Sequence, residues 1–211
     1  MNDAPLGTRG PLDATQPPDR TERIATVGSA DAPTPQDEIV PDGKDWTWVL
    51  ERPCPDCGFV ATDVASDQIA GMVLALTAPW PDLLERADVR TRPAPHVWSV
   101  LEYGCHVRDV CRVFEARVEL MLDRDEPAFD NWDQDDAARV GQYERQDPAS
   151  VAAELASAAD RLARAFLRVP DDGWVRGGVR SNGSPFTVVT LGRYVLHDLR
   201  HHLHDVDATT T

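Results

Sequence analysis

Basic residues are scarce in this chain. The 211 residues hold 21 Lys and Arg against 36 Asp and Glu, which gives a formal net charge of -15. Proteins that bind duplex nucleic acid usually present a basic face, so we expect no nucleic-acid partner. The chain also lacks any apolar run close to the roughly 20 residues of a membrane-spanning helix, so we expect no membrane partner.

Cysteine is also sparse. The chain has four cysteines, too few for a disulfide scaffold of this length. The first residues, MNDAPLGTRGPLDATQPPD, contain no apolar core of a secretory signal. We therefore expect a cytoplasmic protein whose cysteines are free thiols or metal ligands. Its lysine-poor composition, rich in Arg, Ala and Asp, is typical of high-GC bacteria.

The first 62 residues have no clear helical pattern. Residues 1–43 are rich in Pro, Asp, Thr and Gly and poor in aromatic residues, which predicts a disordered acidic tail. Residues 44–62 form a lead-in segment, in which Trp46 and Trp48 are expected to pack onto the domain. The same segment holds the CPDCG turn, residues 54–58.

Four segments repeat apolar residues in steps of three and four, which predicts amphipathic helices over residues 63–77, 99–124, 148–168 and 187–205. Ser99 followed by Glu102 fits a capping box. The polar stretch 123–147 is too long for a tight turn between antiparallel neighbours and predicts a crossover connection. A short hairpin is expected within residues 169–186. Together these features predict an all-α four-helix bundle over residues 63–206 with one long crossover connection.

Three histidines stand where a plain bundle would place apolar side chains. His197 and His201 are four residues apart and so share one face of the last helix. His106 lies on the inner stripe of the second helix. Three imidazoles with an open position are the layout of a catalytic metal site. The alternative is that they are core histidines held by hydrogen bonds. We expect His202 to point away from His201, and His204 is a candidate substitute ligand.

The CPDCG turn permits several interpretations. Cys54 and Cys57 have the spacing of half a zinc knuckle, but the chain has no second such half. They could form a site with His96 or with one helix cysteine, Cys105 or Cys111. A redox pair is a third option, although the βαβ context is missing. The simplest alternative is two ordinary thiols in a proline-stiffened turn.

Over about residues 60–206 the chain resembles the DinB/YfiT-like superfamily of metalloenzymes. The resemblance rests on Trp98, Ser99, Glu102 and His106 on one helix and on His197 and His201 on the last. Members are four-helix bundles that hold a divalent metal, often zinc or nickel, with three histidines. They include mycothiol- and bacillithiol-dependent S-transferases and a maleylpyruvate isomerase. The resemblance implies that His106, His197 and His201 are the metal ligands and that Glu102, one turn before His106, assists at the site.

The function that the resemblance implies is S-transfer by a metal-activated thiol of the mycothiol type onto an electrophilic substrate. The site is compatible with this chemistry, because a coordinated thiol loses its proton readily. Arg180 and Arg200 are candidates to bind carboxylates of the thiol cofactor. A hydrolase that activates water with the same ligands is the first alternative. A non-catalytic metal-binding or interaction bundle is the second. Bundles of this type often pair through helix faces, so a homodimer is a candidate assembly.

Overall fold

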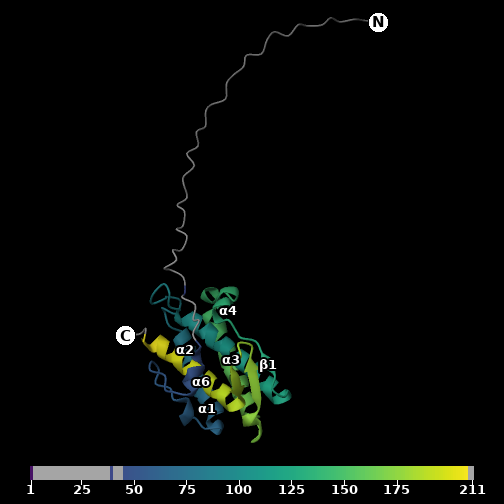
Figure 1. The fold of residues 1–211 in the computed structure, drawn as a ribbon. Helices are drawn as coiled ribbons and strands as arrows, with labels where there is room; N and C mark the ends of the chain where they lie inside the picture. The colour runs from purple at the N-terminus through teal and green to yellow at the C-terminus, as the bar shows by residue number, and fades with distance from the viewer. Residues whose placement is uncertain (2–38, 40–44, 209–211) are drawn as a thin grey trace. The chain divides into compact units, whose positions relative to one another are not determined.

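The computed structural model describes residues 1, 39 and 45–208 (Figure 1). The predicted acidic tail, residues 1–43, falls outside these residues except at Met1 and Ile39. The elements described below belong to one compact unit. Within the described residues, no helix is long and apolar enough to cross a membrane.

Four helices of the structure correspond to the four predicted segments: α1 (Ile69–Thr77), α3 (Val100–Asp123), α5 (Pro148–Leu167) and α6 (Val188–Ala208). A short helix, α2 (Trp80–Leu84), follows α1. Helix α1 begins at Ile69 rather than residue 63, because two 3-10 turns, Ala61–Asp63 and Ser66–Gln68, precede it. The Gln68 side chain accepts the backbone N–H of Ala65 at 3.0 Å and so caps the second turn.

Helix α3 begins with the predicted capping box. The Ser99 hydroxyl accepts the backbone N–H of Glu102 at 3.3 Å, and the Glu102 carboxylate accepts the backbone N–H of Ser99 at 2.8 Å. These bonds satisfy N–H groups that the first helical turn leaves without partners. The cap therefore fixes where α3 starts, nearly two turns before His106.

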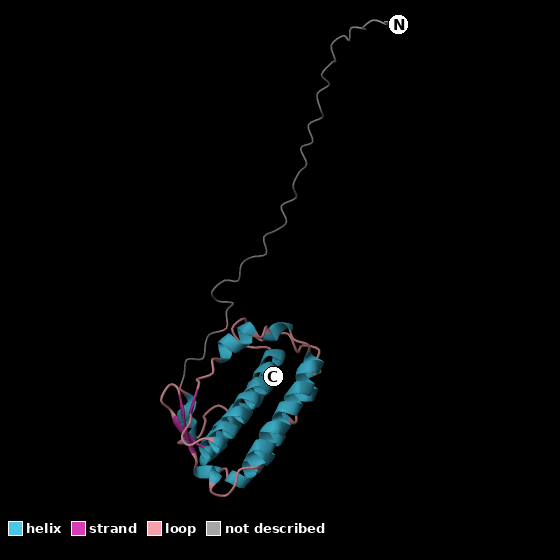
Figure 2. Cartoon of the chain, turned by 90° about the vertical axis from the view of Figure 1, so that its right-hand side faces the viewer, coloured by secondary structure: helices cyan, strands magenta, loops and turns pink. Residues whose placement is uncertain are grey.

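The bundle helices pack as a ring in which α1 and α3 each contact both α5 and α6. Ion pairs give the relative direction of α3 and α5. Three residues of α3, in chain order, are Arg108, Glu115 and Glu119. Their partners on α5 are Glu154, Arg161 and Arg168, in the same order. Helices α3 and α5 therefore run parallel. The chain between them, residues 124–147, must therefore return along the bundle. Figure 2 shows long helices side by side.

The crossover is built from short elements: β1 (Ala128–Phe129), α4 (Gln134–Val140) and a 3-10 turn, Tyr143–Arg145. The Tyr143 hydroxyl ties it to α3 by donating to Asp109 at 2.6 Å. Burial acts to raise the pKa of Asp109, but hydrogen bonds from Arg108 and Tyr143 outweigh it and hold that pKa below its usual range.

A small sheet accompanies the helices (Figure 2). Strands β2 (Gly177–Arg180) and β3 (Pro185–Thr187) pair antiparallel and form the predicted hairpin. Strand β1 from the crossover pairs parallel with β2. The all-α prediction did not include β1, because two residues are too few for any periodicity to be visible.

Candidate metal sites

Helix α6 carries two adjacent pairs of side chains that could bind metal. His197 and His201 lie on one face, and Asp198 and His202 lie on the next, because successive helical residues are about 100° apart. The His201 and His202 rings are 6.1 Å apart and nearly perpendicular. Each pair is joined by side chains from another part of the chain, which produces two clusters of potential ligands.

The His106 cluster consists of His106 from α3 and Asp198 and His202 from α6. Asp198 Oδ1 lies 3.4 Å from His106 Nε2 and 3.3 Å from His202 Nε2. His106 is fully buried. In the described structure, its Nε2 and Asp198 Oδ1 are enclosed atoms with no well-formed hydrogen bond. Enclosed polar atoms without such bonds need an explanation, and a bound cation would supply one.

The spacing of these atoms fits a metal. Two nitrogen or oxygen ligands at about 2.1 Å from a tetrahedral ion lie about 3.4 Å apart. The two separations in the His106 cluster, 3.3 and 3.4 Å, match this value. Three protein ligands leave a fourth position open, as in catalytic zinc sites. The residues present therefore fit a divalent ion.

Electrostatics at the His106 cluster also favour a cation. Burial lowers the pKa of His106, which keeps that imidazole neutral. Burial acts in the opposite sense on Asp198, but its contacts with His106 and His202 hold its pKa well below the usual range. Burial acts to lower the pKa of His202, yet its contacts with the Asp198 and Asp205 carboxylates raise it to about 9. The Asp198 carboxylate thus attracts positive charge, which a bound metal would supply in place of the His202 proton.

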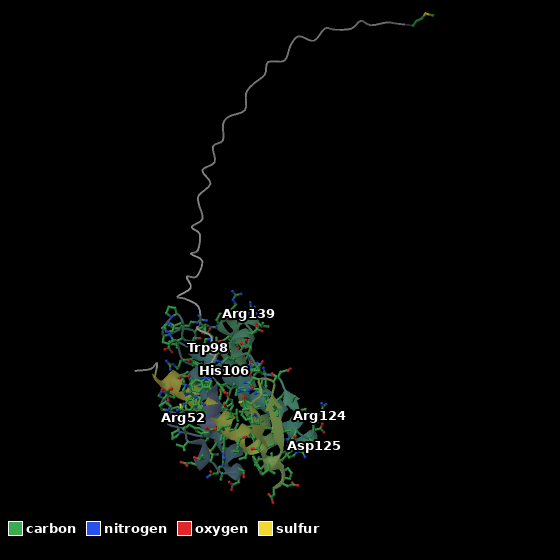
Figure 3. All side chains as sticks on the ribbon, viewed as in Figure 1. Arg52, Trp98, His106, Arg124, Asp125 and Arg139 are labelled. Atoms are coloured by element: carbon green, nitrogen blue, oxygen red, sulfur yellow. The ribbon has the colours of Figure 1, made fainter. Side chains whose placement is uncertain are left out.

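Neighbouring side chains hold the His106 cluster in place. His202 Nδ1 lies 3.0 Å from the Asp205 carboxylate, so its Nε2 is left to face Asp198. This carboxylate–histidine arrangement is the usual support of a metal ligand. The His106 ring is instead flanked by Trp98, at 5.3 Å, and by Trp132, stacked at 5.4 Å. Figure 3 shows Trp98 and His106 close together, far from Arg124 at the other end of α3.

The Cys54 cluster consists of Cys54 and Cys57 from the lead-in segment and of His197 and His201 from α6. Cys54 Sγ lies 3.7 Å from His201 Nδ1. Burial lowers the pKa of His197 to about 4 and also lowers that of His201, so both imidazoles are neutral at pH 7. Without a metal, burial raises the pKa of Cys57 to about 11.

Two small cavities lie beside the clusters. One, of about 180 Å³, is lined by Trp98, Tyr103 and Gln134 together with His202 and Asp205. Its described lining includes two acids and no lysine or arginine. The other, of about 80 Å³, touches His197 and His201 as well as Asp198 and His202. Gln134 borders both cavities, so the crossover connection covers the site.

The structure does not bring the three predicted ligands into one set. Among the described residues, His106 joins Asp198 and His202, whereas His197 and His201 join the two cysteines. The His202 side chain points away from His201, as predicted, and this direction brings its ring to His106. The signal that could have revealed the first set is the spacing of Asp198 and His202, which are also four residues apart.

Other predicted site residues have different surroundings. Glu102 uses its carboxylate in the capping box and in a close ion pair with Arg92. Arg180 is buried in the hairpin, where it donates to Asn182 and Ser184 and lies 3.6 Å from Asp45. It is therefore not available to a cofactor.

Arg200 is exposed and lines a separate cavity of about 450 Å³ beside Cys57. Cys105, Cys111, His96 and His204 lie outside both clusters. His96 is an exposed loop residue, as expected. The partners of Cys54 and Cys57 are thus the two histidines rather than His96 or a helix cysteine.

Known proteins provide two comparisons. The family described as the DinB superfamily matches residues 71–206. Among solved structures, one matching protein is described as "YfiT from Bacillus subtilis is a probable metal-dependent hydrolase with an unusual four-helix bundle topology". The TM-score is 0.63 over 69% of this chain and 85% of YfiT, at 21% identity. At that identity the likeness shows the fold alone. No curated protein matches the sequence.

Proposed function

The chain belongs to the DinB superfamily, and on that basis we propose that it is a metal-dependent enzyme whose catalytic ion is held by His106, Asp198 and His202. The observation that carries the proposal is the convergence of two imidazoles and one carboxylate, at metal-ligand spacing, on a buried point beside a cavity. His197 and His201, which the resemblance implies as ligands of the catalytic ion, belong to the Cys54 cluster instead.

A divalent ion at this site would supply Lewis acidity toward a nucleophile, which is water in hydrolysis or a thiol in S-transfer. We place hydrolysis first, because two histidines and a carboxylate form the donor set of well-known hydrolytic zinc sites. The description of YfiT as a probable metal-dependent hydrolase agrees with this order. Zinc and nickel remain the expected metals.

Thiol transfer is the second candidate. The buried pairing of Arg180 argues against a cofactor held by its carboxylates at that residue. The described lining of the cavity beside His202 holds two acids and no lysine or arginine, which suits an uncharged, hydroxyl-rich thiol such as mycothiol better than an anionic one. An electrophilic small molecule would then be the second substrate. The homodimer and the cytoplasmic location remain predictions.

The chain's own side chains have distinct tasks in this proposal. Asp205 orients His202. Trp98 and Trp132 cover His106 and exclude water from it. Burial raises the pKa of Tyr103, so its hydroxyl stays protonated and can donate to a substrate oxygen in the cavity. Gln134 offers an amide donor in the lining of the same cavity.

The test compares metal-loaded wild type with His106→Ala on an activated ester, and on an activated aryl halide with and without added thiol. We expect metal-dependent turnover that falls by at least about 100-fold in His106→Ala. His204→Ala, on α6 but outside both clusters, should retain turnover. Ester hydrolysis without thiol supports the first candidate, and thiol-dependent loss of halide supports the second. Equal turnover by wild type and His106→Ala would refute the proposed site.

A further inference from the structure

The Cys54 cluster has no task in the proposed catalysis, yet it joins two segments far apart in the sequence. Cys54 and Cys57 have the spacing C-x2-C, and His197 and His201 have the spacing H-x3-H. These are the spacings of the two halves of many structural zinc sites. Both cysteines and His197 are buried, and His201 is partly buried. A buried imidazole nitrogen such as His197 Nε2 usually has a hydrogen-bond partner or a bound ligand.

The backbone shapes the CPDCG turn so that both sulfurs face one side. The N–H of Cys54 donates to the carbonyl of Phe59 at 2.9 Å, and the N–H of Gly58 donates to the carbonyl of Cys54 at 3.0 Å. Gly58 has a φ of 70°, in the left-handed region that favours glycine.

The histidines are turned toward this pair of sulfurs. Nδ1 of His201 faces Cys54 Sγ at 3.7 Å, while its Nε2 faces the Asp205 carboxylate at 3.8 Å. A sulfur at about 2.3 Å and a nitrogen at about 2.1 Å from a tetrahedral zinc lie about 3.6 Å apart. His197 Nε2 is enclosed and has no hydrogen-bond partner among the described residues. All four residues offer donor atoms within 4.8 Å of one another.

We propose that Cys54, Cys57, His197 and His201 bind one structural zinc ion, separate from the catalytic ion. Binding releases the two thiol protons to solvent. Two thiolates then balance the charge of the ion, and the two histidines bind as neutral ligands. The four protein donors complete the tetrahedron, so this site has no open position for substrate.

The structural zinc would fasten the lead-in segment to α6. Trp46, from the 3-10 helix Trp46–Leu50, covers the site with its ring 5.6 Å from His197 and 5.2 Å from His201. His197 and His201 are each followed directly by a ligand of the His106 cluster. Holding these two histidines therefore fixes the rotation of α6 and the direction of Asp198 and His202.

The first measurement is metal content with spectroscopy on the full chain, purified without a His-tag and reloaded with zinc or cobalt. Wild type should bind two ions per chain, and its cobalt form should show a thiolate-to-cobalt charge-transfer band in the near ultraviolet. His106→Ala should lose one ion and keep the charge-transfer band. The band therefore tests the structural zinc site even if the His106 cluster binds no metal. An absent band in wild type, or a Cys54–Cys57 disulfide found by mass spectrometry in freshly purified reduced protein, would overturn the proposal.

The second measurement uses Cys54→Ser with Cys57→Ser, and Cys111→Ala as the matched control. Cys111 is a buried thiol of α3 outside both clusters. The double variant should lose one zinc ion and the charge-transfer band, whereas Cys111→Ala should keep both. A double variant that retains two zinc ions would overturn the proposal. If the double variant does not fold, the wild-type cobalt spectrum still decides, because the band requires cysteine ligands.

Discussion

Asp205→Asn should weaken metal binding at the His106 cluster more than at the Cys54 cluster. One carboxylate oxygen of Asp205 lies 3.0 Å from His202 Nδ1, and the other lies 3.8 Å from His201 Nε2. Only the first contact is within hydrogen-bond distance. A carboxylate in this position fixes the tautomer and direction of the imidazole and raises its basicity toward a metal.

The magnitude follows from these two distances. Loss of such a partner costs about 10- to 100-fold in metal affinity, or about 1.4 to 2.7 kcal/mol. We expect this loss at the His106 cluster, because the 3.0 Å contact with His202 is direct. At the Cys54 cluster the change should stay below the lower end of that range, because the 3.8 Å contact is long and Asp205 is partly exposed to solvent.

The assay is a competition titration of zinc against a chromophoric chelator, with the cobalt charge-transfer band reporting the Cys54 cluster separately. Asp207→Asn is the control, because it removes the same charge from an exposed position of the same helix. Unchanged affinity at the His106 cluster in Asp205→Asn would refute the orienting role of Asp205. Equal weakening at both clusters would refute the assignment of its effect to the His202 contact.

Three further predictions concern stability. In Gly192→Ala the new Cβ would lie 2.7 Å from Ile69 Cδ1, which should destabilise the protein by about 1–3 kcal/mol. In Gly71→Ala the new Cβ meets nothing within 4 Å, so this variant should stabilise the protein by up to about 1 kcal/mol. If the melting temperatures of the two variants shift in the same direction, the packing described at Gly192 is contradicted. The folded pKa of Asp109 is lowered, so its stabilising contribution is present above the unfolded pKa of about 4 and is lost as pH falls through the folded value. The stability deficit of Asp109→Asn in urea should therefore shrink between neutral and strongly acidic pH, and a constant deficit would argue against a charge effect. Ser99→Ala removes the α3 cap and should cost about 1 kcal/mol, whereas unchanged urea unfolding would show that the capping box is dispensable.

The helices could be located from the sequence because their signals are local. The apolar repeat and the Ser99–Glu102 cap predict the start and inner face of α3, and both agree with the structure. The polar stretch before α5 predicts a crossover, because it is too long for a tight turn between antiparallel neighbours. Two-residue β1 carries no such signal, and its pairing with β2 depends on residues about 50 positions away.

The residue types that could bind metal, and the two candidate metal-binding faces of α6, can be read from the sequence alone. Helical geometry dictates that residues four apart share a face, so the faces of His197 with His201 and of Asp198 with His202 follow from the sequence. Which partner meets each face depends on how the helices and the lead-in segment pack together. The rotation of α6 against α3 directs His202 to His106, and the path of the lead-in segment carries Cys54 to His201. A turn of about 100° separates the two faces, and no local pattern fixes the rotation of a packed helix to that precision.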